Sequence, residues 1–80
     1  MVSQKLAKNV DRGLWVEYGA PEDSYSAAVC EVQDVDGVTY VISFHKGDMP
    51  AFKSESYDSL EALEKRMREI EPDMCKWRVR

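Results

Sequence analysis

Two runs of strand-forming residues in the middle of this 80-residue chain lie on either side of a turn sequence, Val35-Asp36-Gly37. An Asp-Gly pair between such runs is a strong short-range signal for a β-hairpin. A hairpin alone is at best marginally stable in water, because one apolar face must be buried against other elements. This feature therefore requires the rest of the chain to supply further strands and a layer that covers them.

The register of the hairpin can be predicted from where its apolar residues fall. A two-residue Asp36-Gly37 loop would set the apolar residues of the second strand beside Val29, Glu31 and Gln33, which is a poor match. We therefore expect a three-residue loop, 35–37, with Gly37 in a left-handed bulge position. That register predicts a common apolar face from three pairs: Val32 with Tyr40, Cys30 with Ile42, and Ala28 with Phe44. Val29, Glu31 and Gln33 would then lie on the opposite face.

Strand patterns also occur before and after the hairpin. In residues 14–18, Leu14, Val16 and Tyr18 alternate with Trp15 and Glu17, which predicts a strand with one apolar face. Residues 51–57 follow Pro50 and are expected to form an edge strand. Residues 74–80 alternate Cys75, Trp77 and Val79 with basic residues, which predicts a last strand.

The main helix is expected at 58–71, with Asp58 as N-cap, Glu61 completing a capping box and Pro72 ending it. Its apolar stripe consists of Leu60, Leu63, Met67 and Ile70. A shorter helix is expected at 2–10, where apolar residues recur every four positions. We therefore predict a single α+β domain spanning residues 1–80, an antiparallel sheet of four to five strands with the 58–71 helix on one face.

Composition limits the environment of this domain. Hydrophobic residues make up 44% of the chain, which excludes a wholly disordered protein. No apolar run approaches the roughly 20 residues that span a bilayer, and the N-terminal MVSQKLAKNV lacks the apolar core of a signal peptide. A cytoplasmic location without membrane contact is expected. Cys30 and Cys75 are then predicted to be reduced, buried, small apolar residues rather than a disulfide.

The usual signatures of catalytic and cofactor sites are missing from the sequence. His45 is the only histidine and has no nucleophile at a recognisable spacing, so an enzyme built on His45 or Cys30 is the least favoured hypothesis. Two dispersed cysteines and one histidine do not match paired zinc ligands, and an EF-hand beginning at Asp34 would have His45 in place of its final glutamate. There is no glycine-rich phosphate loop. We expect no metal and no cofactor.

Charge is the most informative feature of the sequence. The chain has a net charge of −4, and residues 13–45 contain no lysine or arginine. The acids of that stretch are Glu17, Glu22, Asp23, Glu31, Asp34 and Asp36. The tail is basic through Lys76, Arg78 and Arg80. Solubility explains the net charge, but it explains less well why 33 consecutive residues contain no lysine or arginine. Such a surface attracts basic proteins and repels nucleic acid phosphates.

These observations favour a non-enzymatic binding module whose acidic residues occupy the basic, nucleic-acid-binding surface of a protein or ribonucleoprotein. The partner-binding residues would be the six acids, with Trp15 or Tyr25 as aromatic anchor. In size, charge and expected architecture the chain resembles small acidic phage-encoded inhibitors, including anti-CRISPR proteins, and this resemblance implies an inhibitor that mimics nucleic acid. The alternative is an assembly protein, for example a homodimer, in which the basic tail strand of one copy meets the acidic hairpin of another.

Overall fold

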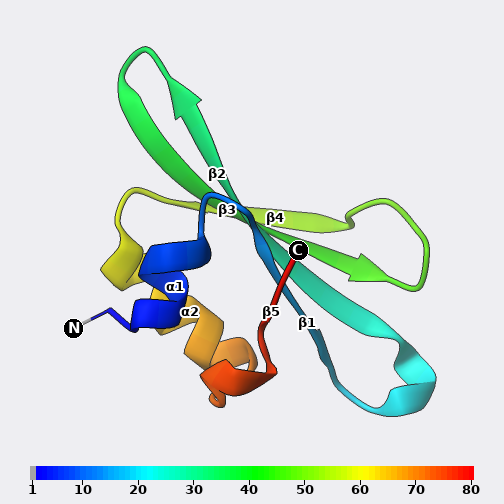
Figure 1. The fold of residues 1–80 in the computed structure, drawn as a ribbon. Helices are drawn as coiled ribbons and strands as arrows, with labels where there is room; N and C mark the ends of the chain where they lie inside the picture. The colour runs from blue at the N-terminus through cyan, green and yellow to red at the C-terminus, as the bar shows by residue number, and fades with distance from the viewer. Residues whose placement is uncertain (1) are drawn as a thin grey trace.

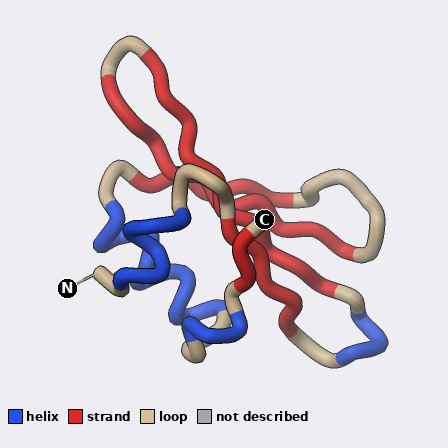
Figure 2. The backbone as a smooth tube through the Cα atoms, in the orientation of Figure 1, coloured by secondary structure: helices blue, strands red, loops and turns tan. Residues whose placement is uncertain are grey.

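The computed structural model describes residues 2–80 and has the predicted α+β architecture (Figure 1). The elements in chain order are α1 (Gln4–Asn9), β1 (Leu14–Tyr18), a 3-10 helix (Pro21–Asp23), β2 (Tyr25–Asp34), β3 (Gly37–Lys46), β4 (Lys53–Tyr57), α2 (Leu60–Ile70), a second 3-10 helix (Met74–Lys76) and β5 (Arg78–Val79). The strands form one antiparallel sheet in the order β4-β3-β2-β1-β5. Both α-helices lie on the same side of this sheet (Figure 2).

The core lies between the helices and the sheet face that they cover. It consists of Leu6, Val10, Leu14, Val16, Ala27, Val29, Ile42, Phe44, Leu63, Met67 and Trp77. The predicted faces of β1 and of the two helices are confirmed, since Leu14, Val16, Leu63 and Met67 are all buried there. We call the uncovered side the open face.

The main helix begins one residue later than predicted. Its N-cap is Ser59 rather than Asp58, because the Ser59 hydroxyl accepts a hydrogen bond from the backbone N–H of Ala62 at 3.2 Å. The helix ends at Ile70, before Pro72. Glu64 of this helix is buried, and its carboxylate accepts a hydrogen bond from the backbone N–H of Ser3, the N-cap of α1.

The predicted hairpin register is wrong by one residue. The structure pairs Asp34 with Gly37, Val29 with Ile42, and Ala27 with Phe44, so the loop consists of Val35 and Asp36 alone. The Asp34 carboxylate accepts a hydrogen bond from the Asp36 N–H at 2.7 Å, and Gly37 has a φ of 131° that favours glycine. A one-residue shift exchanges the two faces of a strand.

This shift changes what each face carries. Val29 is in the core, and Glu31 lies on the helix side opposite Tyr40. Cys30 and Val32 were predicted to belong to the buried apolar face, but they lie on the open face. The reason is that residues 27–30, Ala-Ala-Val-Cys, are all apolar, so alternation alone does not choose between their two faces.

The tail also differs from the predicted strand. Residues 74–76 form a 3-10 helix and only Arg78–Val79 pair with β1, so Cys75 and Val79 are exposed while Trp77 is fully buried. Cys30 and Cys75 are both free thiols, as expected, but both are exposed, which corrects their predicted burial.

The molecule is elongated, with extents of 39 × 25 × 20 Å. The cause is strand length, because β2 and β3 have ten residues each whereas β1 and β4 have five. On β2, only residues 25–29 pair with β1, and on β3, only residues 40–44 pair with β4. Residues 30–39 therefore extend beyond the rest of the sheet as a projecting arm (Figure 1).

Candidate partner-binding surfaces

We call residues 30–39 the hairpin tip. It combines apolar and acidic side chains in an exposed position. Val35 is fully exposed (101%), and Val32 (44%) and Val38 (37%) also remain accessible. Neither neighbouring strand reaches these residues, so the edges of β2 and β3 are unpaired here. Val32 lies on the open face, Val38 on the helix side and Val35 in the turn, so the tip exposes apolar side chains on both of its sides.

Three of the predicted partner-binding acids lie on this tip: Glu31, Asp34 and Asp36. The tip contains no lysine or arginine, and no ion pair among residues 2–80 includes any of the three carboxylates. Only Asp34 has a local structural role, in the turn hydrogen bond to Asp36. The tip therefore presents concentrated negative charge that the protein itself does not neutralise.

The other three predicted acids lie at the opposite end of the hairpin. Glu17 is the penultimate residue of β1, and Glu22 and Asp23 belong to the 3-10 helix between β1 and β2. Glu17 pairs with Ser26, five residues before Glu31 on β2, and the 3-10 helix precedes that strand. At about 3.3 Å per residue, the two groups are therefore about 17–30 Å apart (Figure 1). The structure thus does not bring the six acids into one surface.

The two predicted aromatic anchors are also away from the tip. Tyr25 begins β2 and stacks on Tyr18, with 5.7 Å between the ring centroids. Its ring also meets Phe52, and the ammonium group of Lys46 lies 5.5 Å from its centroid. Tyr25 is therefore part of an aromatic cluster at the far end of the sheet.

Trp15 lies on the open face, which no helix among residues 2–80 covers. The side chains around it are small, including Ser26, Ala28, Ser43 and Ser54. The predicted hairpin register placed Ala28 on the buried face, so this surface could not be recognised from the sequence. Trp15 is the only large aromatic side chain from β1–β5 on this face.

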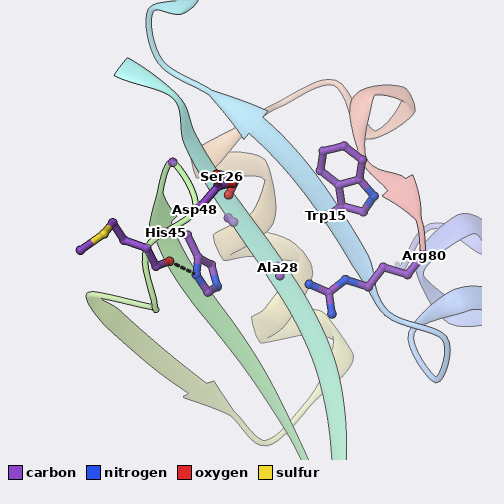
Figure 3. A pocket seen from close by; sticks show the side chains of 9 residues that line it. Trp15, Ser26, Ala28, His45, Asp48 and Arg80 are labelled. Carbon is purple, nitrogen blue, oxygen red and sulfur yellow. Dashed lines mark hydrogen bonds between the residues drawn. The ribbon is translucent and has the colours of Figure 1, made fainter. Parts of the chain in front are cut away.

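Three hollows have Trp15 in their lining, and two of them also include basic residues of the tail. The first, of ≈ 470 Å³, is lined in part by Ser26, Ala28, His45, Asp48 and Arg80 (Figure 3). The second, of ≈ 420 Å³, lies between β1 and the tail and includes Glu17, Lys76 and Arg78. The Arg78 guanidinium lies over the indole ring, 5.3 Å from its centroid. We call Trp15, Arg78, Arg80 and these two hollows the Trp15 site.

Ser26, His45 and Asp48 share the first hollow, which invites comparison with a hydrolase triad. His45 Nδ1 is 3.3 Å from the carbonyl oxygen of Met49, and among residues 2–80 no hydrogen bond joins His45 to Ser26 or Asp48 (Figure 3). Nucleophilic catalysis needs a bond between nucleophile and base. This geometry gives no support to catalysis at His45.

The groups with clearly shifted pKa values connect structural elements. Arg66 donates to Glu55 across 2.8 Å, and this bond is the main cause that lowers the pKa of Glu55 to about 2. Tyr57 and Lys53 also donate to that carboxylate. The network ties β4 to α2 and lies at neither the tip nor the Trp15 site.

Comparison with protein-family models, curated proteins and solved structures gave no match to this chain. Within residues 2–80 there is no cluster of three or more His, Cys, Asp or Glu side chains placed to hold a metal ion. None of the helices in the described part of the chain is long and apolar enough to cross a membrane.

Proposed function

We propose that the protein is a non-enzymatic binding module that docks its hairpin tip against a basic surface of a partner. The observation that carries this proposal is the composition of the projecting tip. Three exposed valines and three carboxylates without ion-pair partners lie within ten residues that contain no base.

The two kinds of side chain have different roles in this proposal. Burial of the valines supplies apolar contact, at about 25 cal/mol per Å² of surface removed from water. The carboxylates attract a basic surface from a distance and select it over acidic or neutral ones. Both act at one place because the tip extends past the neighbouring strands.

The charge of the tip also indicates the class of partner. A surface that attracts three clustered carboxylates is basic, as are surfaces that hold nucleic acid phosphates. We infer a nucleic-acid-binding protein or ribonucleoprotein, whose basic groove the tip occupies in place of nucleic acid, so that the protein acts as an inhibitor. The two exposed free thiols suit a reducing compartment, and we place the protein in the cytoplasm.

Two matched variants test this proposal. The tip variant carries Glu31→Gln, Asp34→Asn and Asp36→Asn, and the amide oxygen introduced at position 34 retains the acceptor for the turn. The control carries Glu17→Gln, Glu22→Gln and Asp23→Asn, which removes the same charge from the other end of β2. Tagged proteins are used to capture partners from a host lysate at about 0.05 M and about 0.5 M salt, since screening weakens charged contacts.

We expect the wild-type protein to capture one basic nucleic-acid-binding protein at low salt and to release it when double-stranded DNA or RNA is added. The tip variant should bind that protein roughly 100-fold more weakly, as the loss of several charged contacts costs a few kcal/mol. The control should bind within about twofold of wild type. Equal losses in the two variants, or capture that added nucleic acid does not reverse, would contradict the proposal.

A further inference from the structure

The Trp15 site has the opposite charge to the hairpin tip. Arg78 lies opposite Trp15 in the β1–β5 register and covers one side of the ring. The backbone N–H of Arg80 donates to the Gly13 carbonyl at 3.1 Å, which holds the chain beside β1. In Figure 3 the Arg80 guanidinium extends toward Ala28 on β2. No ion pair within residues 2–80 includes either arginine.

Within one molecule, Asp34 and Asp36 of the tip lie far from Trp15, and Glu31 faces the helix side of the sheet. Trp15 pairs with Ala28, and Asp34 lies six residues further along the same strand. At about 3.3 Å per residue this separation is about 20 Å, and the intervening strand is held extended by its pairing with β3. Complementary surfaces that cannot meet within one molecule can meet between two.

We propose that the Trp15 site binds the hairpin tip of a second copy of this chain. Val32 and Val35 would contact the Trp15 ring, and Asp34 and Asp36 would pair with Arg78 and Arg80. The small side chains of Ser26 and Ala28 at the floor leave room for this approach. Glu17 and Asp48 at the margin favour a short acidic segment over a continuous polyanion, which would have to pass them.

This contact is heterologous, because it joins two different surfaces of the same chain. Each bound molecule still has a free tip or a free site, so association either extends into chains or closes reciprocally between two copies. The inference goes beyond the proposed function, since it assigns a second site. The two uses of the tip exclude each other, so self-association would compete with a basic partner.

The test uses two complementary variants in sedimentation experiments from about 1 µM to about 1 mM protein, which covers weak association. The tip variant (Glu31→Gln, Asp34→Asn, Asp36→Asn) keeps an intact Trp15 site. The site variant (Arg78→Gln, Arg80→Gln) keeps an intact tip. A control variant, Lys8→Gln with Lys65→Gln, removes two exposed positive charges from the helices. Circular dichroism checks that each variant is folded.

We expect the average mass of the wild type and of the control to rise with concentration. The tip variant alone and the site variant alone should each associate at least about tenfold more weakly than the wild type. A tenfold loss of affinity corresponds to about 1.4 kcal/mol. Mixed in equal amounts, the two variants should form a one-to-one heterodimer, because the mixture contains one intact tip and one intact site per pair.

Three results would overturn the inference: a wild type that stays monomeric throughout, a site variant that associates like the wild type, or a mixture that stays monomeric. The outcome is independent of the proposed function. The site variant keeps its tip, so it should still capture the basic partner from lysate. Loss of self-association with capture retained would separate the two proposals.

Discussion

At the scale of single residues, the Glu55 carboxylate has a strongly lowered pKa. Its pKa falls from the ordinary 4.5 to about 2, mainly through the hydrogen bond from Arg66. A second bond joins Arg66 to the other oxygen of the same carboxylate at 3.3 Å. Such bidentate contacts between an arginine and a carboxylate are among the stronger charged interactions in proteins.

This pKa shift predicts a loss of stability in acid. Because the folded-state pKa is lowered, the contribution of Glu55 is present above about pH 4.5 and is lost as the pH falls through about 2. The free energy of unfolding, measured by urea titration between those values, should therefore fall with decreasing pH. Glu55→Gln should reduce the slope by up to about 1.4 kcal/mol per pH unit, the value for one proton.

Removal of the partner should have the same effect as removal of the acid. Arg66→Gln should reduce the slope as Glu55→Gln does, whereas Lys65→Gln, an exposed neighbour, should not. An unchanged slope in Glu55→Gln would show that other carboxylates cause the acid sensitivity.

At the scale of elements, α1 depends on α2. It has six residues, too few for a helix to be stable alone in water. Leu6 anchors it in the core, and the backbone N–H of Ser3 donates to the Glu64 carboxylate at 2.8 Å. Burial acts to raise the pKa of Glu64, but hydrogen bonds from Ser3 and the charge of Arg68 outweigh it, so the pKa is lowered.

Glu64→Ala should therefore lower the free energy of unfolding by about 1–3 kcal/mol, because the Ser3 N–H loses its charged acceptor. Glu64→Gln should cost less, since an amide oxygen still accepts that bond. Lys65→Ala, on the exposed side of the same helix, should stay within about 0.5 kcal/mol of wild type. Urea titration at neutral pH measures the free energy of unfolding of all three variants. If Glu64→Ala lowered it no more than Lys65→Ala does, Glu64 would not anchor α1.

At the scale of the whole molecule, the core and the hairpin tip that we propose as the binding element are separate. The helices and Trp77 close the core at one end of the sheet, and the hairpin tip extends away from it (Figure 1). Trp77 is fully buried, and its indole N–H donates to the Glu71 carbonyl at 3.3 Å. The tip contributes no residue to the core.

Trp77→Ala should accordingly cost about 3–5 kcal/mol, the usual cost of truncating a buried aromatic residue. Since a domain of this size has a total stability of about 5–10 kcal/mol, a measurable unfolded fraction should appear in two-dimensional NMR spectra. Val35→Ala at the tip should change stability by less than about 0.5 kcal/mol. A large destabilisation by Val35→Ala would show that the tip takes part in folding.

The sequence by itself determined the elements and most of their faces. The stripe of Leu63 and Met67 and the alternation of Leu14 with Trp15 are local patterns, and the helical and strand periods convert them directly into buried and exposed sides. The Asp-Gly turn signal likewise located the hairpin, since turn chemistry depends only on neighbouring residues.

Only the tertiary structure decided the hairpin register, the burial of Trp77 and the separation of the six acids. Apolar residues at both Val29 and Cys30 make either face of β2 acceptable in isolation, and burial under the helices selects Val29. The acids all lie within residues 13–45, but the long strand β2 leads from the group of Glu17, Glu22 and Asp23 to the group of Glu31, Asp34 and Asp36. The arrangement of the strands decides which charged residues share a surface, and this arrangement depends on long-range packing.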